Sequence, residues 1–263
     1  MSRDLPSTYV EGFHDEAACR AMVYKPLGKT GMDVSILSLG AVRCVCRGLL
    51  LAYTAIHRGV PHLSYAALSK CRARIHLTSQ HTRTLLSHPH SQSALGSVFN
   101  ETIEAESLKV VSEALKNGIN YIDVAAWYGF GKAETVLGKA LALVPRESYF
   151  VSSKCCRYLP DVLETFDWSA ERTIRSVDES LERLGVEYID VMQIHDPEFC
   201  PDLDIICNVT LPALQQCKDA GKIRFIGITG YPLEAQRYII ENTIVKVDTR
   251  FVLYDWFLRF LSL

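Results

Sequence analysis

The chain has 263 residues, of which 48% are apolar, and it carries nine cysteines and a formal net charge of −2. This length fits one large α/β domain or two small ones, and the near-neutral charge gives no general case for binding nucleic acid or an anionic membrane. No apolar run is long enough for a transmembrane helix, the first residues lack the apolar region of a signal peptide, and the odd cysteine count without regular spacing indicates a reducing, cytoplasmic setting.

The first forty residues are predicted to contain an extension followed by a hairpin. Residues 1–21 are expected to form an exposed, partly ordered N-terminal extension. Residues 22–40 then indicate a hairpin-like start, in which the turn Gly28-Lys29-Thr30-Gly31 leads to a buried strand at 34–40.

The segment 42–93 has a different composition from the rest of the chain. It contains no Asp or Glu, yet it carries seven Lys or Arg residues and six of the eight histidines, without a helical or a strand period. A structureless stretch of this length is unusual inside a compact domain. We expect a basic, disordered insertion, and one explanation is translated non-coding sequence, since its removal joins Leu39-Gly40-Ala41 to Ala94-Leu95-Gly96.

From residue 101 onward, short apolar strands alternate with amphipathic helices. Helix stop and start signals support the division, for example Gly118 after the first helix, and Ser169 and Gly185 around a later one. Such alternation is typical of parallel βαβ units. The predicted helices are 102–117, 132–142, 169–184, 209–220 and 232–241, and the predicted strands are 121–125, 148–154, 188–195, 223–229 and 245–249.

Polar residues end three of these strands. Asp123, Lys154 and His195 each stand at or just beyond a strand end, and Tyr128 follows Asp123 in a turn rich in small residues. Each of them alone has an ordinary structural explanation, such as a helix cap, a loop aromatic or a solvated strand end. Together they predict one site built from several strands.

Five short motifs in this order resemble those of the aldo-keto reductase family. The resemblance covers about 22–41 and 94–249, and within the family the later motifs look most like the branch of L-galactose dehydrogenase and the aldose 1-dehydrogenases. The motifs are Leu27-Gly28-Lys29-Thr30-Gly31, Asp123-Val124-Ala125-Ala126-Trp127-Tyr128-Gly129 with Glu134, Ser153-Lys154, Gln193-Ile194-His195-Asp196 and Gly221-Lys222-Ile223-Arg224-Phe225-Ile226-Gly227-Ile228-Thr229.

The resemblance implies an α/β fold, the (β/α)8 TIM barrel, with its active site at the carboxyl ends of the strands. It implies hydride transfer between a nicotinamide cofactor, NADP(H) first and NAD(H) second, and a small carbonyl or sugar substrate. Tyr128 would be the general acid and His195 would steer the substrate oxygen, while Lys154, held by Asp123, would lower the pKa of the phenol. Thr229 and Gly230, with Gln193 nearby, would contact the nicotinamide, and no metal is expected.

The predicted barrel is incomplete, because only about six of the eight strands are present by Thr249. The missing units include the loops that commonly hold phosphate groups in such barrels. The tail 250–263 is apolar and divergent from the family. The predicted function is therefore an NAD(P)-dependent oxidoreductase, an aldose dehydrogenase by resemblance. The alternative is a truncated, catalytically impaired isoform or gene-model product that binds cofactor weakly or not at all.

A third hypothesis places a metal or nucleic-acid site in 42–93. The segment supplies cysteines and histidines, but pairs such as Cys44-Val45-Cys46 and His88-Pro89-His90 do not match a known zinc framework. This spacing argues against a metal site in the segment. The sequence leaves open the substrate, the oligomeric state and the choice between NADP and NAD.

Overall fold

A curled parallel β-sheet forms the centre of the protein, whose computed structural model describes residues 4–40, 95, 103–161 and 164–252. Its six strands follow one another in space as they do in sequence, and every neighbouring pair is parallel. The strands are β3 (Leu39–Gly40), β4 (Tyr121–Asp123), β5 (Phe150–Cys155), β6 (Ile189–His195), β7 (Ile223–Gly230) and β8 (Thr249–Val252). This arrangement confirms the predicted incomplete (β/α)8 barrel.

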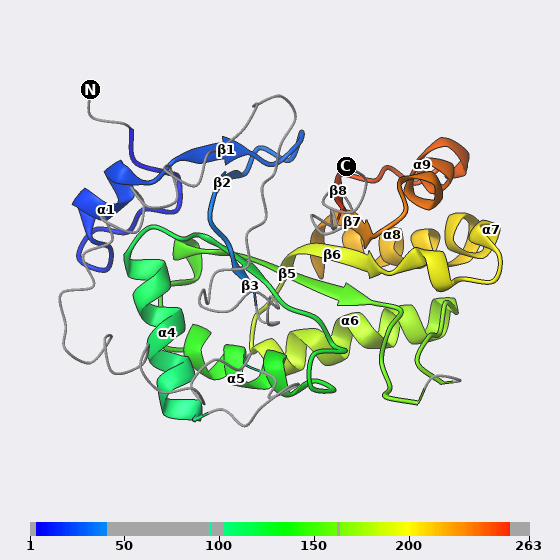
Figure 1. Ribbon diagram of the computed structural model, residues 1–263, viewed down its shortest axis with the longest axis horizontal. Coiled ribbons are helices and arrows are strands. Elements are labelled where there is room, and N and C mark those ends of the chain that lie inside the picture. Colours follow the sequence, from blue (N-terminus) through cyan, green and yellow to red (C-terminus); the bar gives the residue numbers. More distant parts are fainter. Residues whose placement is uncertain (1–3, 41–94, 96–102, 162–163, 253–263) are drawn as a thin grey trace, which may run out of the picture.

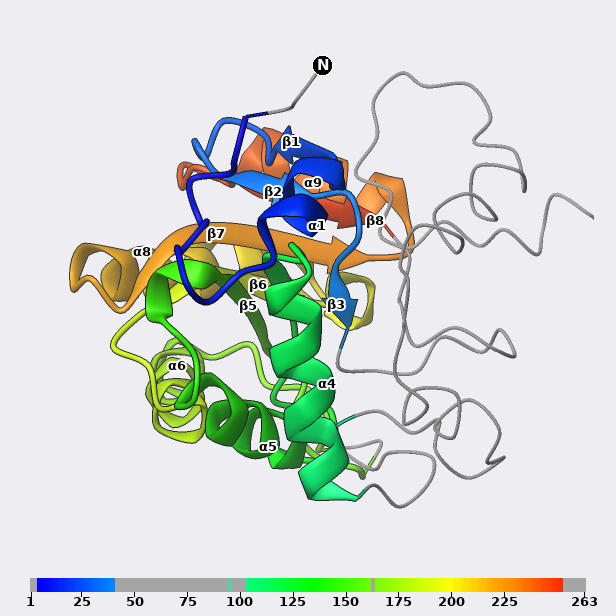
Figure 2. The same cartoon turned by 90° about the vertical axis from the view of Figure 1, so that its left-hand side faces the viewer.

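Helices cover one side of the sheet. Figure 2 shows α4 (Glu104–Lys116), α5 (Lys132–Leu141) and α6 (Ala170–Leu184) side by side below strands β5 to β7. Two further helices, α8 (Leu211–Asp219) and α9 (Leu233–Asn242), follow β6 and β7 (Figure 1). Strand residues that face these helices, such as Ile122, Val151 and Met192, are fully buried in the larger apolar core. Among the described residues, none of the helices is long and apolar enough to cross a membrane.

The predicted helix ends are confirmed where a cap was visible in the sequence. Ser169 accepts a hydrogen bond from the backbone N–H of Arg172, and Gly185 ends α6 in the left-handed conformation. Gly118 follows α4 with a φ of 89°, which suits glycine because a side chain there would be strained. Each of these signals involves only residues at or next to the helix end, so the sequence alone is enough to predict that end.

An antiparallel hairpin closes the amino-terminal end of the sheet. It consists of β1 (Tyr24–Pro26) and β2 (Asp33–Ser35), and its predicted turn at 28–31 is confirmed. The hairpin contributes Leu27, Met32 and Val34 to a second apolar cluster, where they pack against the first inward-facing residues of the strands. Those inward-facing residues are Tyr121, Phe150, Val191 and Phe225. The smaller cluster therefore lies inside the curl of the sheet, and the larger core lies between the sheet and the helices.

Two strand boundaries differ from the prediction. The expected strand at 34–40 is divided into the end of β2 and the short β3, because the Ser35 N–H donates to Asn120 Oδ1 at 2.7 Å. The expected strand at 245–249 lies later, at Thr249–Val252. Pairing with β7 starts only where the Asp248 N–H reaches the carbonyl of Ile226 at 2.8 Å.

The helix before β7 also begins earlier than predicted. A short helix α7 (Leu203–Ile205) runs into a π-helical turn at Ile206–Thr210 and then into α8. Thr210 Oγ1 donates to the carbonyl of Trp168 at 2.7 Å, so this irregular turn is tied to the loop before α6. π-Helical turns are rare and are frequent near functional sites.

The N-terminal segment is more closely packed than the extension predicted at 1–21. It forms helix α1 (Glu16–Ala21), capped by Asp15, and buries Cys19 completely. The segment 42–93 lies outside the described residues, and so do the proposed metal ligands within it. The described residues contain no cluster of three or more metal-binding side chains.

Asn120 joins the hairpin and the N-terminal segment to the barrel. Its buried side chain accepts from the Ser35 N–H and donates to Thr8 Oγ1 at 3.0 Å and to the carbonyl of Asp33 at 2.9 Å. Asn120→Ala leaves the buried Ser35 N–H and Thr8 hydroxyl without this partner, so we expect a loss of about 1–3 kcal/mol in the free energy of unfolding, measured by urea denaturation. Asn117→Ala, which removes an exposed hydrogen bond to Glu113, is the control and should change it by about 0.5 kcal/mol or less. Equal effects of the two changes would contradict this role.

Candidate active site

Three of the four predicted catalytic residues lie on neighbouring strands at the carboxyl edge of the sheet. Asp123 ends β4, Lys154 is the penultimate residue of β5 and His195 ends β6. The register pairs Lys154 with Gln193 and His195 with Thr229. Since alternate strand residues face the same side, these side chains all project into the curled interior of the sheet, opposite the helices.

Lys154 is the centre of this group. Its buried ammonium lies 2.6 Å from Asp123 Oδ2 and 2.9 Å from the carbonyl of Val124. The same nitrogen stands 4.6 Å from the centre of the Tyr128 ring. Burial alone would lower the pKa of Lys154, but Asp123 and Tyr128 beside it raise that pKa above its ordinary value. Lys154 is therefore charged at neutral pH and lies between the carboxylate and the phenol.

Tyr128 is held by a tight turn between β4 and α5. The Tyr128 N–H donates to the carbonyl of Ala125 at 3.1 Å, and the next three residues, Gly129, Phe130 and Gly131, all have positive φ. Burial raises the pKa of the phenol, while Lys154 lowers it and Asp123 raises it. The sequence predicted the effect of Lys154 correctly in direction, but burial outweighs it. The phenol is protonated at neutral pH, as a proton donor must be.

His195 is buried beside the phenol. Its ring centre lies 5.8 Å from that of Tyr128, and the two rings are nearly perpendicular. Burial, and then the positive charges of Lys154 and Arg157, hold the pKa of His195 well below its ordinary value. The imidazole is therefore neutral, and its Nδ1 is buried without a hydrogen-bond partner. A neutral imidazole with an unused nitrogen can exchange a hydrogen bond with a substrate oxygen.

The three predicted cofactor contacts differ in their surroundings. Thr229 is buried on β7 opposite His195. Gly230 follows it, and its carbonyl accepts from Gln236 Nε2 at 3.0 Å. Gln193 donates to Asp123 Oδ1 at 3.0 Å and to Ser152 Oγ at 2.6 Å, so its amide supports the carboxylate of the site. Both oxygens of Asp123 are therefore engaged, one by Lys154 and one by Gln193.

Sequence reasoning missed an ion pair at the rim of this site. Arg157 Nη1 lies 2.6 Å from Asp196 Oδ2, and Asp196 is buried directly after His195. The guanidinium of Arg157 also stands 3.7 Å above the ring of Trp127. Asp196 was within a motif that the sequence singled out, but nothing in the sequence indicates its partner, since the pair spans 39 residues.

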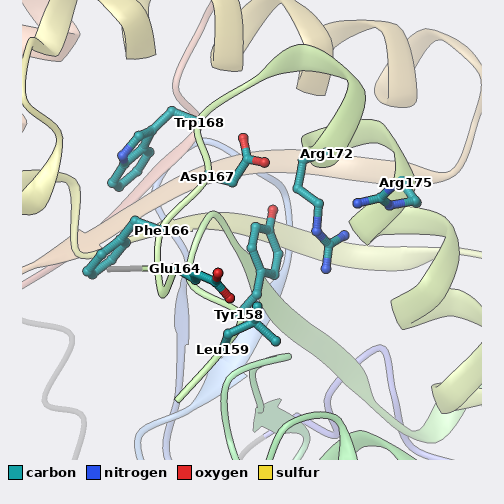
Figure 3. A pocket seen from close by; sticks show the side chains of 8 residues that line it. All are labelled: Tyr158, Leu159, Glu164, Phe166, Asp167, Trp168, Arg172 and Arg175. Carbon is teal, nitrogen blue, oxygen red and sulfur yellow. The ribbon is translucent and has the colours of Figure 1, made fainter. Parts of the chain in front are cut away.

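A cavity of about 610 Å³ lies beside this group, within the loop that follows β5 and the first turns of α6 (Figure 3). Figure 3 shows the Tyr158 side chain rising between Asp167 and Arg172. Phe166 lines the cavity and also lies 5.5 Å below the guanidinium of Arg157, so the cavity and the site share a wall. The lining residues are Tyr158, Leu159, Glu164, Phe166, Asp167, Trp168, Arg172 and Arg175, and none of the four predicted catalytic residues is among them.

The sequence profile of the aldo/keto reductase family matches residues 92–257. The chain belongs to this family. L-Galactose dehydrogenase of Arabidopsis thaliana is 48% identical over 152 residues, which are 57% of this chain and 46% of that protein. D-threo-Aldose 1-dehydrogenase of a Pseudomonas species is 33% identical over 184 residues, or 61% of this chain and 56% of that protein. The chain spans about half the length of these curated relatives.

Solved structures of aldo-keto reductases share the fold. A Pseudomonas aeruginosa protein assigned to the family has 27% identity and a TM-score of 0.54, with 81% of this chain and 62% of that chain covered. An aldo-keto reductase of Bacillus halodurans has 22% identity and a TM-score of 0.57, with 85% and 55% covered. The six-stranded sheet therefore corresponds to part of an aldo-keto reductase barrel.

Proposed function

We propose that the protein is an NAD(P)-dependent oxidoreductase that interconverts an aldehyde, ketone or sugar lactol with the corresponding alcohol or lactone. The observation that carries this proposal is the position of the Lys154 ammonium between the carboxylate of Asp123 and the ring of Tyr128. A buried, protonated phenol beside a fixed cation has the properties of a general acid. The relatives named as aldose dehydrogenases support a sugar as substrate.

In the reducing direction, Tyr128 donates its proton to the substrate oxygen. Lys154 stabilises the phenolate that remains, and Asp123 and Gln193 fix the ammonium and the carboxylate. His195 donates a hydrogen bond to the same oxygen and orients the carbonyl toward Tyr128. In the oxidising direction the phenolate accepts the proton. A bound nicotinamide supplies or accepts the hydride.

The residues present fit the nicotinamide end of such a cofactor. Thr229 and Gly230 end β7 beside His195, and the buried, unpartnered nitrogens His195 Nδ1 and Trp127 Nε1 leave polar capacity in the same region. We assign Thr229 and Gly230 to contact with the nicotinamide, and Gln193 to support of Asp123 beneath it. NADP(H) is the expected form, with NAD(H) as the alternative.

The proposed setting is a reducing compartment, the cytoplasm, with a small carbonyl or sugar as the partner. All six cysteines that the structure describes are unpaired and buried, which suits such a compartment. We further infer that the barrel unit begins at residue 22, with 42–93 inserted into it, and that it extends past the predicted boundary at 249 to include β8, which ends at Val252.

One observation favours the second hypothesis, a protein with weak cofactor binding. Within the described ranges, β3 and β8 are the outer strands of the sheet, and each pairs along one edge only. A closed barrel leaves no such edges. In a complete barrel, the loops after the seventh and eighth strands are also the usual binding place for cofactor phosphates.

Titration with NADPH and NADH separates the two hypotheses. Trp127 lies 6.4 Å from the Tyr128 ring, so its fluorescence should report a nicotinamide at the site. We expect saturable quenching below about 1 mM, the usual upper limit for enzyme ligands, with NADPH binding more tightly than NADH. Trp127→Phe should lose most of the signal while Trp168→Phe retains it. Absence of saturable quenching, together with no oxidation of aldoses by NADP⁺ or NAD⁺, would favour the impaired protein.

A further inference from the structure

Two residues with left-handed backbone follow the strands that carry Lys154 and His195. Cys156 has a φ of 76° and Asp196 a φ of 53°. For residues other than glycine this conformation is strained and persists only where neighbouring groups enforce it. Both strand ends are therefore held by contacts outside their own turns.

Arg157 makes the contact that joins these two ends. It follows Cys156 directly, and its Nη1 lies 2.6 Å from Asp196 Oδ2. The side chain of Asp196 is only 4% exposed, so solvent does not screen the pair strongly. The Asp196 N–H also donates to the carbonyl of Thr229 at 2.8 Å, which connects the pair to β7.

The same guanidinium reaches the loop that carries Tyr128. It lies 3.7 Å above the ring of Trp127, and that ring is 6.4 Å from the ring of Tyr128 and 6.5 Å from that of His195. A planar guanidinium can stack on an aromatic face and form an ion pair at the same time, which a lysine does less well. Arg157 therefore contacts the segments after β4, β5 and β6, one for each of the strands that lead to the site.

We propose that Arg157 is a positioning residue that holds Tyr128 and His195 in place against Lys154, by joining the three loops through Asp196 and Trp127. This inference rests on the proposed function for its catalytic consequence, but its structural content does not. Misplacement of a reacting group by about 1 Å can lower a rate by about 100-fold.

The charges around His195 agree with this role. The charged and titratable groups that face the imidazole, among the described residues, are Lys154 from β5, Arg157 from the next loop, Asp196 beside it and Tyr128 from the loop after β4. Arg157 is one of the causes that lower the pKa of His195, after burial and Lys154. Loss of Arg157 should therefore raise this pKa and leave Asp196 buried without its partner.

The test compares Arg157→Gln with Arg146→Gln. Arg146 is a matched control, because it also pairs with a buried aspartate, Asp190, at 2.8 Å and is exposed to a similar degree, 27% against 25%, but at the opposite end of the strands. We expect Arg157→Gln to lower kcat by about 10- to 100-fold with a smaller change in KM. Arg157→Lys should recover part of this loss. Arg146→Gln should lower thermal stability and leave kcat unchanged.

Two readouts work without turnover. The first is an NMR titration, in which the His195 signal is assigned from its loss in His195→Asn. Arg157→Gln should raise the pH at which His195 becomes protonated. The second is the fluorescence of Trp127, which Arg157→Gln should change. Arg146→Gln should change neither. If Arg157→Gln leaves both readouts unchanged, or if Arg146→Gln changes them equally, the positioning role is wrong. If the unaltered protein lacks activity but these readouts behave as expected, the proposed function fails and the inference stands.

Discussion

Tyr128→Phe should lower kcat for carbonyl reduction by about 100- to 10,000-fold, the usual contribution of a general acid. The change removes only the hydroxyl, and the ring keeps its position 4.6 Å from the Lys154 ammonium. KM and the binding of cofactor should change little, because the proton is transferred in the transition state. Initial rates with reduced cofactor and an aldose or a simple aldehyde measure the effect.

Tyr158→Phe is the matched control for this change. Tyr158 is also buried, but it lines the neighbouring cavity, whose lining includes none of the four predicted catalytic residues (Figure 3). We expect its kcat to stay within about threefold of the unaltered protein, in line with small effects away from the reacting atoms. A comparable loss in both variants would assign the effect to folding. An unchanged kcat in Tyr128→Phe would remove this tyrosine from the mechanism.

Asp190→Ala should give a large loss of stability, about 3–5 kcal/mol in the free energy of unfolding. The carboxylate is fully buried near the start of β6 and accepts from Arg146 at 2.8 Å, from Arg224 at 2.7 Å and from the Val151 N–H at 2.9 Å. Its removal leaves two guanidinium groups and a buried N–H without their acceptor. Urea unfolding followed by circular dichroism measures the change.

Asp178→Ala provides the comparison, since Asp178 pairs with Lys222 at 2.5 Å on the surface, where both side chains are about one-third to one-half exposed. Exposed pairs of this kind contribute about 1 kcal/mol or less. A loss for Asp190→Ala as small as that for Asp178→Ala would show that the two arginines are solvated adequately without the carboxylate.

Local signals in the sequence were sufficient for the alternation of the main strands and helices after residue 101, but not for the short helices α1 and α7. The helix from 169 to 184 has its cap at Ser169 and its glycine at 185 within a few residues of its ends, and the structure places α6 at Ala170–Leu184. Strand boundaries were harder where pairing depends on distant groups. β8 begins at Thr249 because Asp248 bonds to Ile226, 22 residues away in the sequence. Nothing in the sequence near residue 248 contains that information.

The candidate site also combines features that the sequence predicts with features that depend on distant residues. The sequence brought Asp123, Tyr128, Lys154 and His195 together, because parallel strands present their carboxyl ends at one edge. It also predicted the sign of the effect of Lys154 on Tyr128. It did not predict that burial raises the pKa of the phenol more than Lys154 lowers it. Burial depends on everything that packs around the ring.

The sequence by itself determined the family, the strand–helix order and the four polar residues at the strand ends. These follow from periodicity, caps and short motifs, which are properties of neighbouring residues. Only the tertiary structure decided the protonation of Tyr128, the support of Asp123 by Gln193, and the pairing of Arg157 with Asp196. The pair Arg157–Asp196 joins residues 39 positions apart and the pair Gln193–Asp123 joins residues 70 positions apart, and the energy of each contact depends on how far the folded chain excludes water from it.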